Sequence, residues 1–221
     1  MSYFQEGGTG YSVLKRLHYL DPFWTLHGGG ALVYHLGHRD LKELDFFCEQ
    51  SMWRESLAEF TANTIVPPSI PDFLSLRQNA TETWRDPRRG VFKLHFEKVT
   101  LSFIRFARVS GTQERLRRPG LLPIAGLVDI AVLKLVVLRH RHKLVDYVDW
   151  VAILRRSGLS IGEIIEGFYA LRDVYPERES LRECLINLAD IPPGCEEFLQ
   201  FEDIRLLREA SVEGLRILEK Q

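Results

Sequence analysis

The fold is decided by a glycine-rich stretch near the start of the chain, TLHGGGALVYHLGHRDLKELDFF, residues 25–47. An apolar run leads into the three glycines at 28–30, residues 31–36 predict a short helix with Gly37 as its C-cap, and residues 44–48 predict a strand. Glycines between a strand and a helix let backbone amides approach a ligand, and a helix N-terminus favours phosphate. Simple turn geometry explains the same glycines, so the pattern leaves both interpretations open.

An acidic pair follows the glycines within the same stretch. Glu43 and Asp45 are two residues apart in the predicted strand, so their side chains share one face while Leu44 faces the core. Two carboxylates on one face repel unless a cation joins them, and magnesium takes such oxygen ligands together with substrate phosphates. A solvated charged face is the alternative. Glycines that hold phosphates and carboxylates that hold a metal are the parts that phosphoryl transfer requires.

Composition sets the class of protein. The 221 residues are 45% hydrophobic and 27% charged, and 29 basic against 30 acidic residues give a net charge of -1. We therefore expect a folded protein whose contact with nucleic acid would need a local basic patch. The three cysteines lack the short paired spacing of a zinc site and are expected to be reduced core residues of a cytoplasmic protein. The longest apolar stretch, residues 121–138, contains Asp129 and Lys134, which argues against a membrane span.

Periodicity divides the chain near RLRRPGLLP, residues 115–123. The first half alternates helices and strands, and the second half repeats apolar residues at helical spacing. We predict an α/β (α+β) protein, with a small mixed sheet and helices over residues 1–118 and a helical C-terminal bundle over 119–221. The expected helices are 11–19, 31–36, 52–63, 128–140, 143–157, 161–174, 180–188 and 195–220. The expected strands are 23–26, 44–48, 91–96 and 99–106. Residues 80–90 are expected to be a loop.

Two blocks of the sequence resemble the nucleotidyltransferase-fold toxins of the AbiEii/AbiGii type. GGGALVYHLGHRDLKELDFF (28–47) is similar to the first motifs of that family. GLVDIAVLKLVVLRHRHKLVDYVDWVAILRRSG (126–158) is similar to its later motifs, in which an Asp and a Lys share one helix and an Asp pair opens the next. The resemblance implies a nucleotidyltransferase fold, a nucleoside triphosphate substrate with Mg (or Mn), and transfer of a nucleotide to an acceptor such as the end of a transfer RNA. It also implies a toxin partnered by an antitoxin.

The resemblance carries roles to individual positions of this chain. It implies catalytic roles for Asp45, Lys134 and Asp146, and it implies metal binding by Glu43 and Asp45. The residues implied to bind the nucleotide are Gly28, Gly29, Gly30, Arg39 and Asp149.

The chain also departs from the family pattern. Gly30 stands where the family often has Thr or Ser, Leu41 stands where a serine is common, and Val145 replaces a lysine. Ser102 stands where the fold normally supplies a third carboxylate. These departures favour an alternative function, a catalytically degenerate module of the same fold that binds a nucleotide or a protein.

Each candidate of the second half also has a structural explanation. Asp129 falls near a helix start, where a carboxylate acts as a cap or through the dipole. Lys134, on an apolar helix, either reaches water or finds an acidic partner. The pair Asp146 and Asp149 could instead bind the basic residues Arg139, His142 or Arg155.

Overall fold

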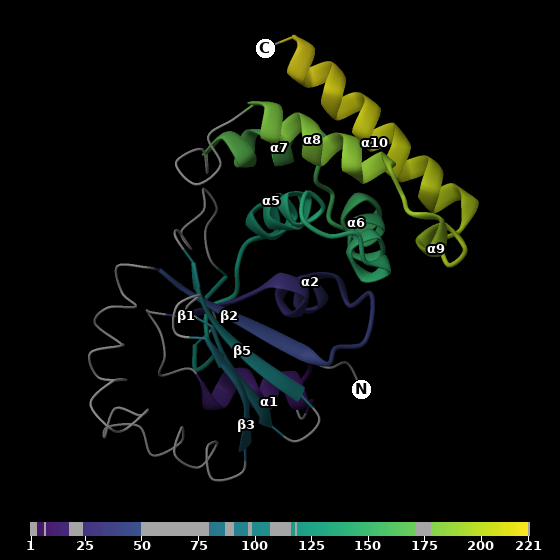
Figure 1. Ribbon diagram of the computed structural model, residues 1–221. Coiled ribbons are helices and arrows are strands. Elements are labelled where there is room, and N and C mark those ends of the chain that lie inside the picture. Colours follow the sequence, from purple (N-terminus) through teal and green to yellow (C-terminus); the bar gives the residue numbers. More distant parts are fainter. Residues whose placement is uncertain are drawn as a thin grey trace. The chain divides into compact units, whose positions relative to one another are not determined.

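The computed structural model describes most of the chain as two compact units, shown in Figure 1. One unit lies within Met1–Ser110 and Glu114–Ala125, and the other lies within Gly126–Gln221. The described residues are 4–6, 8–17, 24–49, 80–86, 91–96, 99–106, 116–117, 119–170 and 178–220. The helix expected at 52–63 lies outside them.

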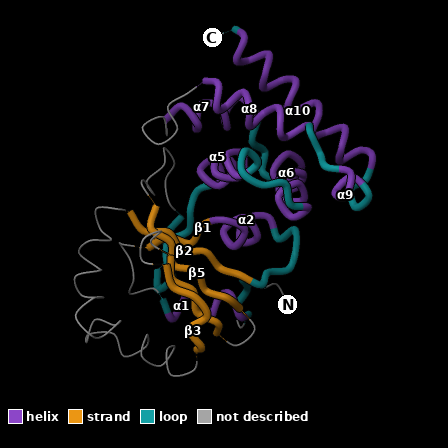
Figure 2. Tube along the Cα trace, in the orientation of Figure 1, coloured by secondary structure: helices purple, strands orange, loops and turns teal. Residues whose placement is uncertain are grey.

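The first unit is built on a mixed sheet. Among its described residues, five strands pair in the order β1-β2-β5-β4-β3. All neighbouring strands are antiparallel except β2 and β5, which run parallel. The bounds are β1 Trp24–His27, β2 Glu43–Glu49, β3 Ala80–Asp86, β4 Val91–Phe96 and β5 Val99–Phe106, and Figure 2 shows these strands in orange.

The sheet confirms most of the strand predictions. β4 and β5 have the expected bounds and pair antiparallel, with Phe96 opposite Val99. In β2 the residues Leu44, Phe46 and Cys48 are fully buried, in alternation with partly exposed neighbours, as the period of two predicts.

The loop predicted at residues 80–90 is wrong over Ala80–Asp86, which form β3 at the edge of the sheet. The prolines and charges of this region suggested a loop. The proline of the predicted loop, Pro87, follows β3 in the sequence, and an edge strand tolerates charged residues because only one side of its backbone needs a pairing partner.

Helix α2 (Gly28–Leu36) continues directly from β1. It begins three residues earlier than predicted, at the first glycine, and Gly37 ends it as a left-handed C-cap with φ of 56°. Helix α1 (Thr9–Arg16) precedes β1.

The outer edge of β1 is covered by the segment that ends the first unit. The backbone N–H of Leu26 donates to Pro123, and the N–H of Ala125 donates to Leu26, at 2.8 and 2.9 Å. The ring nitrogen Nε2 of His35 bonds to the carbonyl of Ala125 at 2.8 Å and ties α2 to the same segment. Burial lowers the pKa of His35, so the ring is neutral at pH 7.

The second unit is helical, as the sequence predicts. Its helices are α5 Leu127–Val137, α6 Leu144–Arg156, α7 Ile161–Ala170, α8 Arg178–Ala189, α9 Pro193–Glu196 and α10 Phe201–Glu219. Its core is formed by large residues such as Tyr147, Trp150 and Phe168, each at most 1% exposed. No described helix of the chain is long and apolar enough to cross a membrane.

The single helix predicted at 195–220 is wrong, because the chain forms α9 and then starts α10 anew. A capping box between Gln200 and Asp203 begins the second helix. Such reciprocal bonds satisfy the free amides of a new first turn, so the chain leaves one helix and begins another there.

The cysteines Cys48, Cys184 and Cys195 are free and buried, as expected. Burial raises the pKa of the Cys184 thiol to about 11, which keeps it protonated and unreactive near neutral pH.

Candidate functional site

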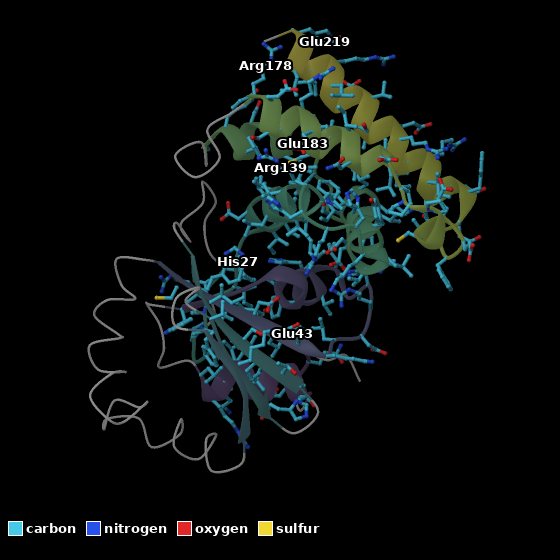
Figure 3. All side chains as sticks on the ribbon, in the orientation of Figure 1. His27, Glu43, Arg139, Arg178, Glu183 and Glu219 are labelled. Carbon is cyan, nitrogen blue, oxygen red and sulfur yellow. The ribbon has the colours of Figure 1, made fainter. Side chains whose placement is uncertain are left out.

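A row of polar side chains crosses one face of the sheet in the first unit. In register, His27 of β1 lies beside Asp45 of β2, Asp45 lies beside Ser102 of β5, and Ser102 lies beside Lys93 of β4. Glu43 is two residues before Asp45 and therefore shares this face. The structure thus confirms that the two carboxylates lie on one face, and Figure 3 labels His27 and Glu43 on this sheet.

Glu43 is held by two donors from neighbouring strands. The Lys93 ammonium and the Ser102 hydroxyl both bind its Oε1, each at 2.5 Å. The side chains of Lys93 and Glu43 are 34% and 42% exposed, whereas Ser102 is fully buried. The ion pair is therefore open to solvent on one side, and its orientation is fixed from below by a buried hydroxyl.

Asp45 lies against the first turn of α2. Gly28, the first residue of that helix, has φ of 58°, a conformation that glycine adopts without strain. A Cβ at Gly28 would come within 2.6 Å of Oδ2 of Asp45, so only glycine leaves room for the carboxylate. The glycine turn and the acidic strand, read separately in the sequence, are thus in direct contact.

The other predicted residues of this unit have different surroundings. Gly29 is the second residue of α2 and is half-buried. Gly30 is buried, and a Cβ there would lie 2.9 Å from Leu44, so this glycine lets the helix pack closely on the sheet. Arg39 follows α2, and its guanidinium donates to the carbonyl of Asp40 at 3.2 Å.

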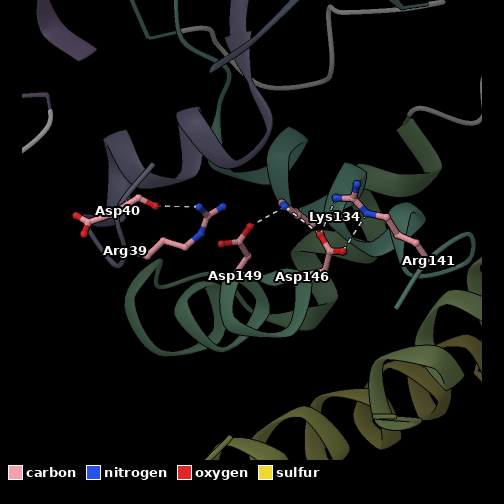
Figure 4. Close-up of polar contacts among 6 residues, drawn as sticks. All are labelled: Arg39, Asp40, Lys134, Arg141, Asp146 and Asp149. Atoms are coloured by element: carbon pink, nitrogen blue, oxygen red, sulfur yellow. Dashed lines mark hydrogen bonds and ion pairs between the residues drawn. The ribbon is translucent and has the colours of Figure 1, made fainter. Parts of the chain in front are cut away.

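The second unit holds a separate cluster of charges, shown in Figure 4. Lys134 on α5 is paired with Asp149 at 2.6 Å and with Asp146 at 3.3 Å, both on α6. Arg141 donates two hydrogen bonds to Asp146, each of 3.0 Å. Both carboxylates are fully buried and Lys134 is 7% exposed, whereas the side chain of Arg141 is 46% exposed. Two buried negative charges are thus compensated by a buried ammonium and by a guanidinium that reaches in from the surface.

This cluster settles the pairing alternatives of the sequence. Lys134 has the acidic partners that its apolar surroundings require. Two of the basic residues considered as partners pair elsewhere, Arg139 with Glu183 and Arg155 with Asp203.

Two further candidates have structural surroundings of their own. His142 bonds to the hydroxyl of Tyr147 at 2.8 Å. Asp129 is 4% exposed and lies in the first turn of α5, where a carboxylate is stabilised by the helix dipole.

The donors on the sheet face fit one divalent cation. Magnesium is commonly bound by one or two carboxylates while water and substrate phosphates complete its shell, and Glu43 and Asp45 supply such a pair. Among the described residues no three His, Cys, Asp or Glu side chains come together as a metal-binding group. The position opposite Asp45 is Ser102, so a third carboxylate is missing from this row.

Known structures identify the fold. The chain has a nucleotidyltransferase fold. A protein of H. pylori provisionally named a nucleotidyltransferase superposes with a TM-score of 0.50 and 17% identity, over 95% of this chain and 93% of that one. The nucleotidyltransferase toxin MenT4 of Mycobacterium tuberculosis superposes with a TM-score of 0.50 and 15% identity, over 95% of this chain and 91% of that one. No protein-family model and no curated protein sequence matches the chain.

Lys93 and Arg141 are the site residues that sequence reasoning missed. The signal for Lys93 was present, because the hairpin that sets Phe96 opposite Val99 also sets Lys93 opposite Ser102. Arg141 lies just before α6, in the basic run RHRHK of residues 139–143, and nothing in that run singles it out as the partner of Asp146.

Proposed function

We propose that this protein is a nucleotidyltransferase that binds a nucleoside triphosphate with magnesium or manganese and transfers a nucleotide to an acceptor hydroxyl. The contact between Asp45 and Gly28 carries the proposal, because it joins an acidic strand to the start of a helix that suits phosphate. The nucleotidyltransferase fold supports it. We further propose an RNA acceptor such as the end of a transfer RNA, and a cytoplasmic toxin of the AbiEii/AbiGii type that is partnered by an antitoxin.

The proposed reaction follows from these positions. The acceptor oxygen forms a bond to the α-phosphorus, the bond from that phosphorus to the bridging oxygen breaks, pyrophosphate leaves, and the hydroxyl proton passes to solvent. Gly28 and Gly29 would present backbone amides to the phosphates. A divalent cation held by Glu43 and Asp45 would neutralise phosphate charge and lower the pKa of the acceptor hydroxyl.

The remaining site residues enter the proposal through the sequence resemblance. The resemblance implies catalytic roles for Lys134 and Asp146 and nucleotide binding by Asp149. In this proposal Lys134 neutralises charge on the phosphates, and its ion pairs with the two carboxylates hold the ammonium in place. Arg39 binds the nucleotide.

Binding of a labelled nucleotide with and without magnesium tests the proposal. We expect magnesium-dependent binding that Asp45→Ala abolishes, and transfer of an α-phosphate label to RNA. Asp40→Ala is the matched control, since Asp40 is an exposed carboxylate outside the proposed set. Absence of nucleotide binding in the wild-type protein would refute the proposal.

Ser102 and Lys93 favour a second candidate function, a module that binds nucleotide or protein without catalysis. Ser102 stands where a third carboxylate would complete a metal site, and Lys93 already pairs with Glu43, one of the two carboxylates present. Metal-dependent nucleotide binding with no label transferred to RNA or to protein would identify this function.

A further inference from the structure

Glu43 already has a positively charged partner on this face of the sheet. Two donors, the ammonium of Lys93 and the hydroxyl of Ser102, converge on the same oxygen, Oε1. In a two-metal phosphoryl-transfer site, acidic ligands are shared between two cations about 3.5 to 4 Å apart. The Lys93 ammonium therefore supplies Glu43 with a positively charged partner, as a bound cation would.

The sheet fixes Lys93 in this place. Its strand, β4, is paired with β5 on the one side and with β3 on the other, and Lys93 lies directly opposite Ser102 in the β4–β5 register. Ser102 is in turn directly opposite Asp45 across the parallel pair. Lys93, Ser102 and Asp45 are thus held in one row by backbone pairing. The pairing fixes the position from which the Lys93 side chain reaches Glu43, and the ion pair with Glu43 places its ammonium.

Charge on this face favours one divalent cation rather than two. Glu43 and Asp45 are the carboxylates of the row, and Lys93 offsets one of their charges. One divalent cation together with Lys93 would outweigh the two carboxylates and leave a net positive charge that attracts phosphate. A second would be repelled by the ammonium, with Ser102 offering no negative charge at the third position.

We propose that Lys93 takes the place of one cation of a two-metal site, so that the protein binds a single divalent cation at Glu43 and Asp45. This inference rests on the proposed function and specifies its metal requirement. Lys93 acts through Glu43 and is a positioning residue.

Manganese alone is the probe for this inference, and the signal of free Mn²⁺ in electron paramagnetic resonance gives affinity and stoichiometry. We expect one ion per chain in the wild-type protein. Lys93→Met should bind Mn²⁺ about tenfold more tightly, because the repulsion from a neighbouring positive charge is removed. Lys93→Arg retains the charge and should restore the wild-type affinity. The double variant Lys93→Met/Ser102→Asp should bind two ions.

The control is Lys42→Met, which removes an exposed lysine next to Glu43 in sequence and should leave the Mn²⁺ affinity within about twofold of wild type at 0.1 M salt. Two ions, or none, in the wild-type protein overturn the inference without any variant. Unchanged affinity in a folded Lys93→Met also overturns it, and the proposed function survives if nucleotide binding persists. If neither Mn²⁺ nor nucleotide binds the wild-type protein, the proposed function fails together with the inference.

Discussion

Replacing Gly28 with alanine tests the contact on which the proposed function rests. Gly28 has a positive φ, and a new Cβ would meet the Asp45 carboxylate at 2.6 Å. Because Oδ2 is the free end of a short side chain, we expect Asp45 to rotate away while the strand stays in place. The fold should survive, and the carboxylate should leave its position beside α2.

The expected magnitude has two parts. An alanine in the left-handed region costs about 1 to 2 kcal/mol. Forcing Asp45 toward a less favourable rotamer adds about 0.5 to 1.5 kcal/mol. Gly37→Ala is a matched control at the C-cap of the same helix, since its φ is 56° and a Cβ there would meet nothing within 4 Å. Gly37→Ala should therefore show only the cost of placing an alanine in the left-handed region.

Hydrogen exchange of the β2 amides measures the free energy of unfolding of this unit, and Mn²⁺ titration measures the site. We expect Gly28→Ala to be less stable than Gly37→Ala by about 1 kcal/mol and to bind Mn²⁺ at least about tenfold more weakly than wild type. Gly37→Ala should bind as wild type does. The reasoning is refuted if Gly28→Ala binds metal and nucleotide like the wild-type protein.

Three further predictions concern stability. Lys134→Met should lower the free energy of unfolding by about 3 to 5 kcal/mol, because it removes the buried cation that pairs with Asp149 and Asp146. Adding Asp149→Asn should recover part of this loss, as measured by hydrogen exchange of α6 amides. Because the pKa of His35 is lowered in the folded protein, the unfolded chain binds more protons below about pH 6.5. The free energy of unfolding should therefore fall as the pH drops below that value. His35→Gln should flatten this pH dependence in thermal unfolding. Gly167→Ala should destabilise the helical unit by about 1 to 3 kcal/mol in denaturant titration, since its Cβ would lie 2.5 Å from a valine methyl group. In the same helix, a Cβ at Gly162 would meet nothing closer than 3.8 Å, so Gly162→Ala should be neutral or stabilising.

The local elements of the fold followed from local patterns. Alternating residues predicted the buried face of β2, and the apolar runs at 91–96 and 99–106 predicted β4 and β5 with the bounds that the structure has. The start of α10 was missed, although Gln200 and Asp203 have capping-box spacing, because the apolar period continues across the break. β3 was missed although Thr81, Thr83 and Trp84 favour a strand, because Pro87 and the charged residues around it indicated a loop over the whole segment.

The site was less predictable than the fold. The sequence correctly placed Glu43 and Asp45 on one face, because the period of a strand fixes which residues share a side. It did not predict the contact of Asp45 with Gly28, which depends on how α2 turns back onto the sheet. It also did not predict Lys93 as the partner of Glu43, since these residues are joined only through β5, a strand that lies between theirs.

The parallel pairing of β2 with β5 has a consequence for the order of folding. β4 and β5 adjoin along the chain and form a hairpin on the microsecond scale, whereas Glu43 reaches its neighbour Thr100 only after a long intervening segment has closed into a loop. Lys93 and Ser102 are therefore expected to come together early, and the two carboxylates to join them last. The bonds from Lys93 and Ser102 to Glu43 would then form only when β2 pairs with β5, so the ion pair on this face is among the last contacts of the sheet to be made.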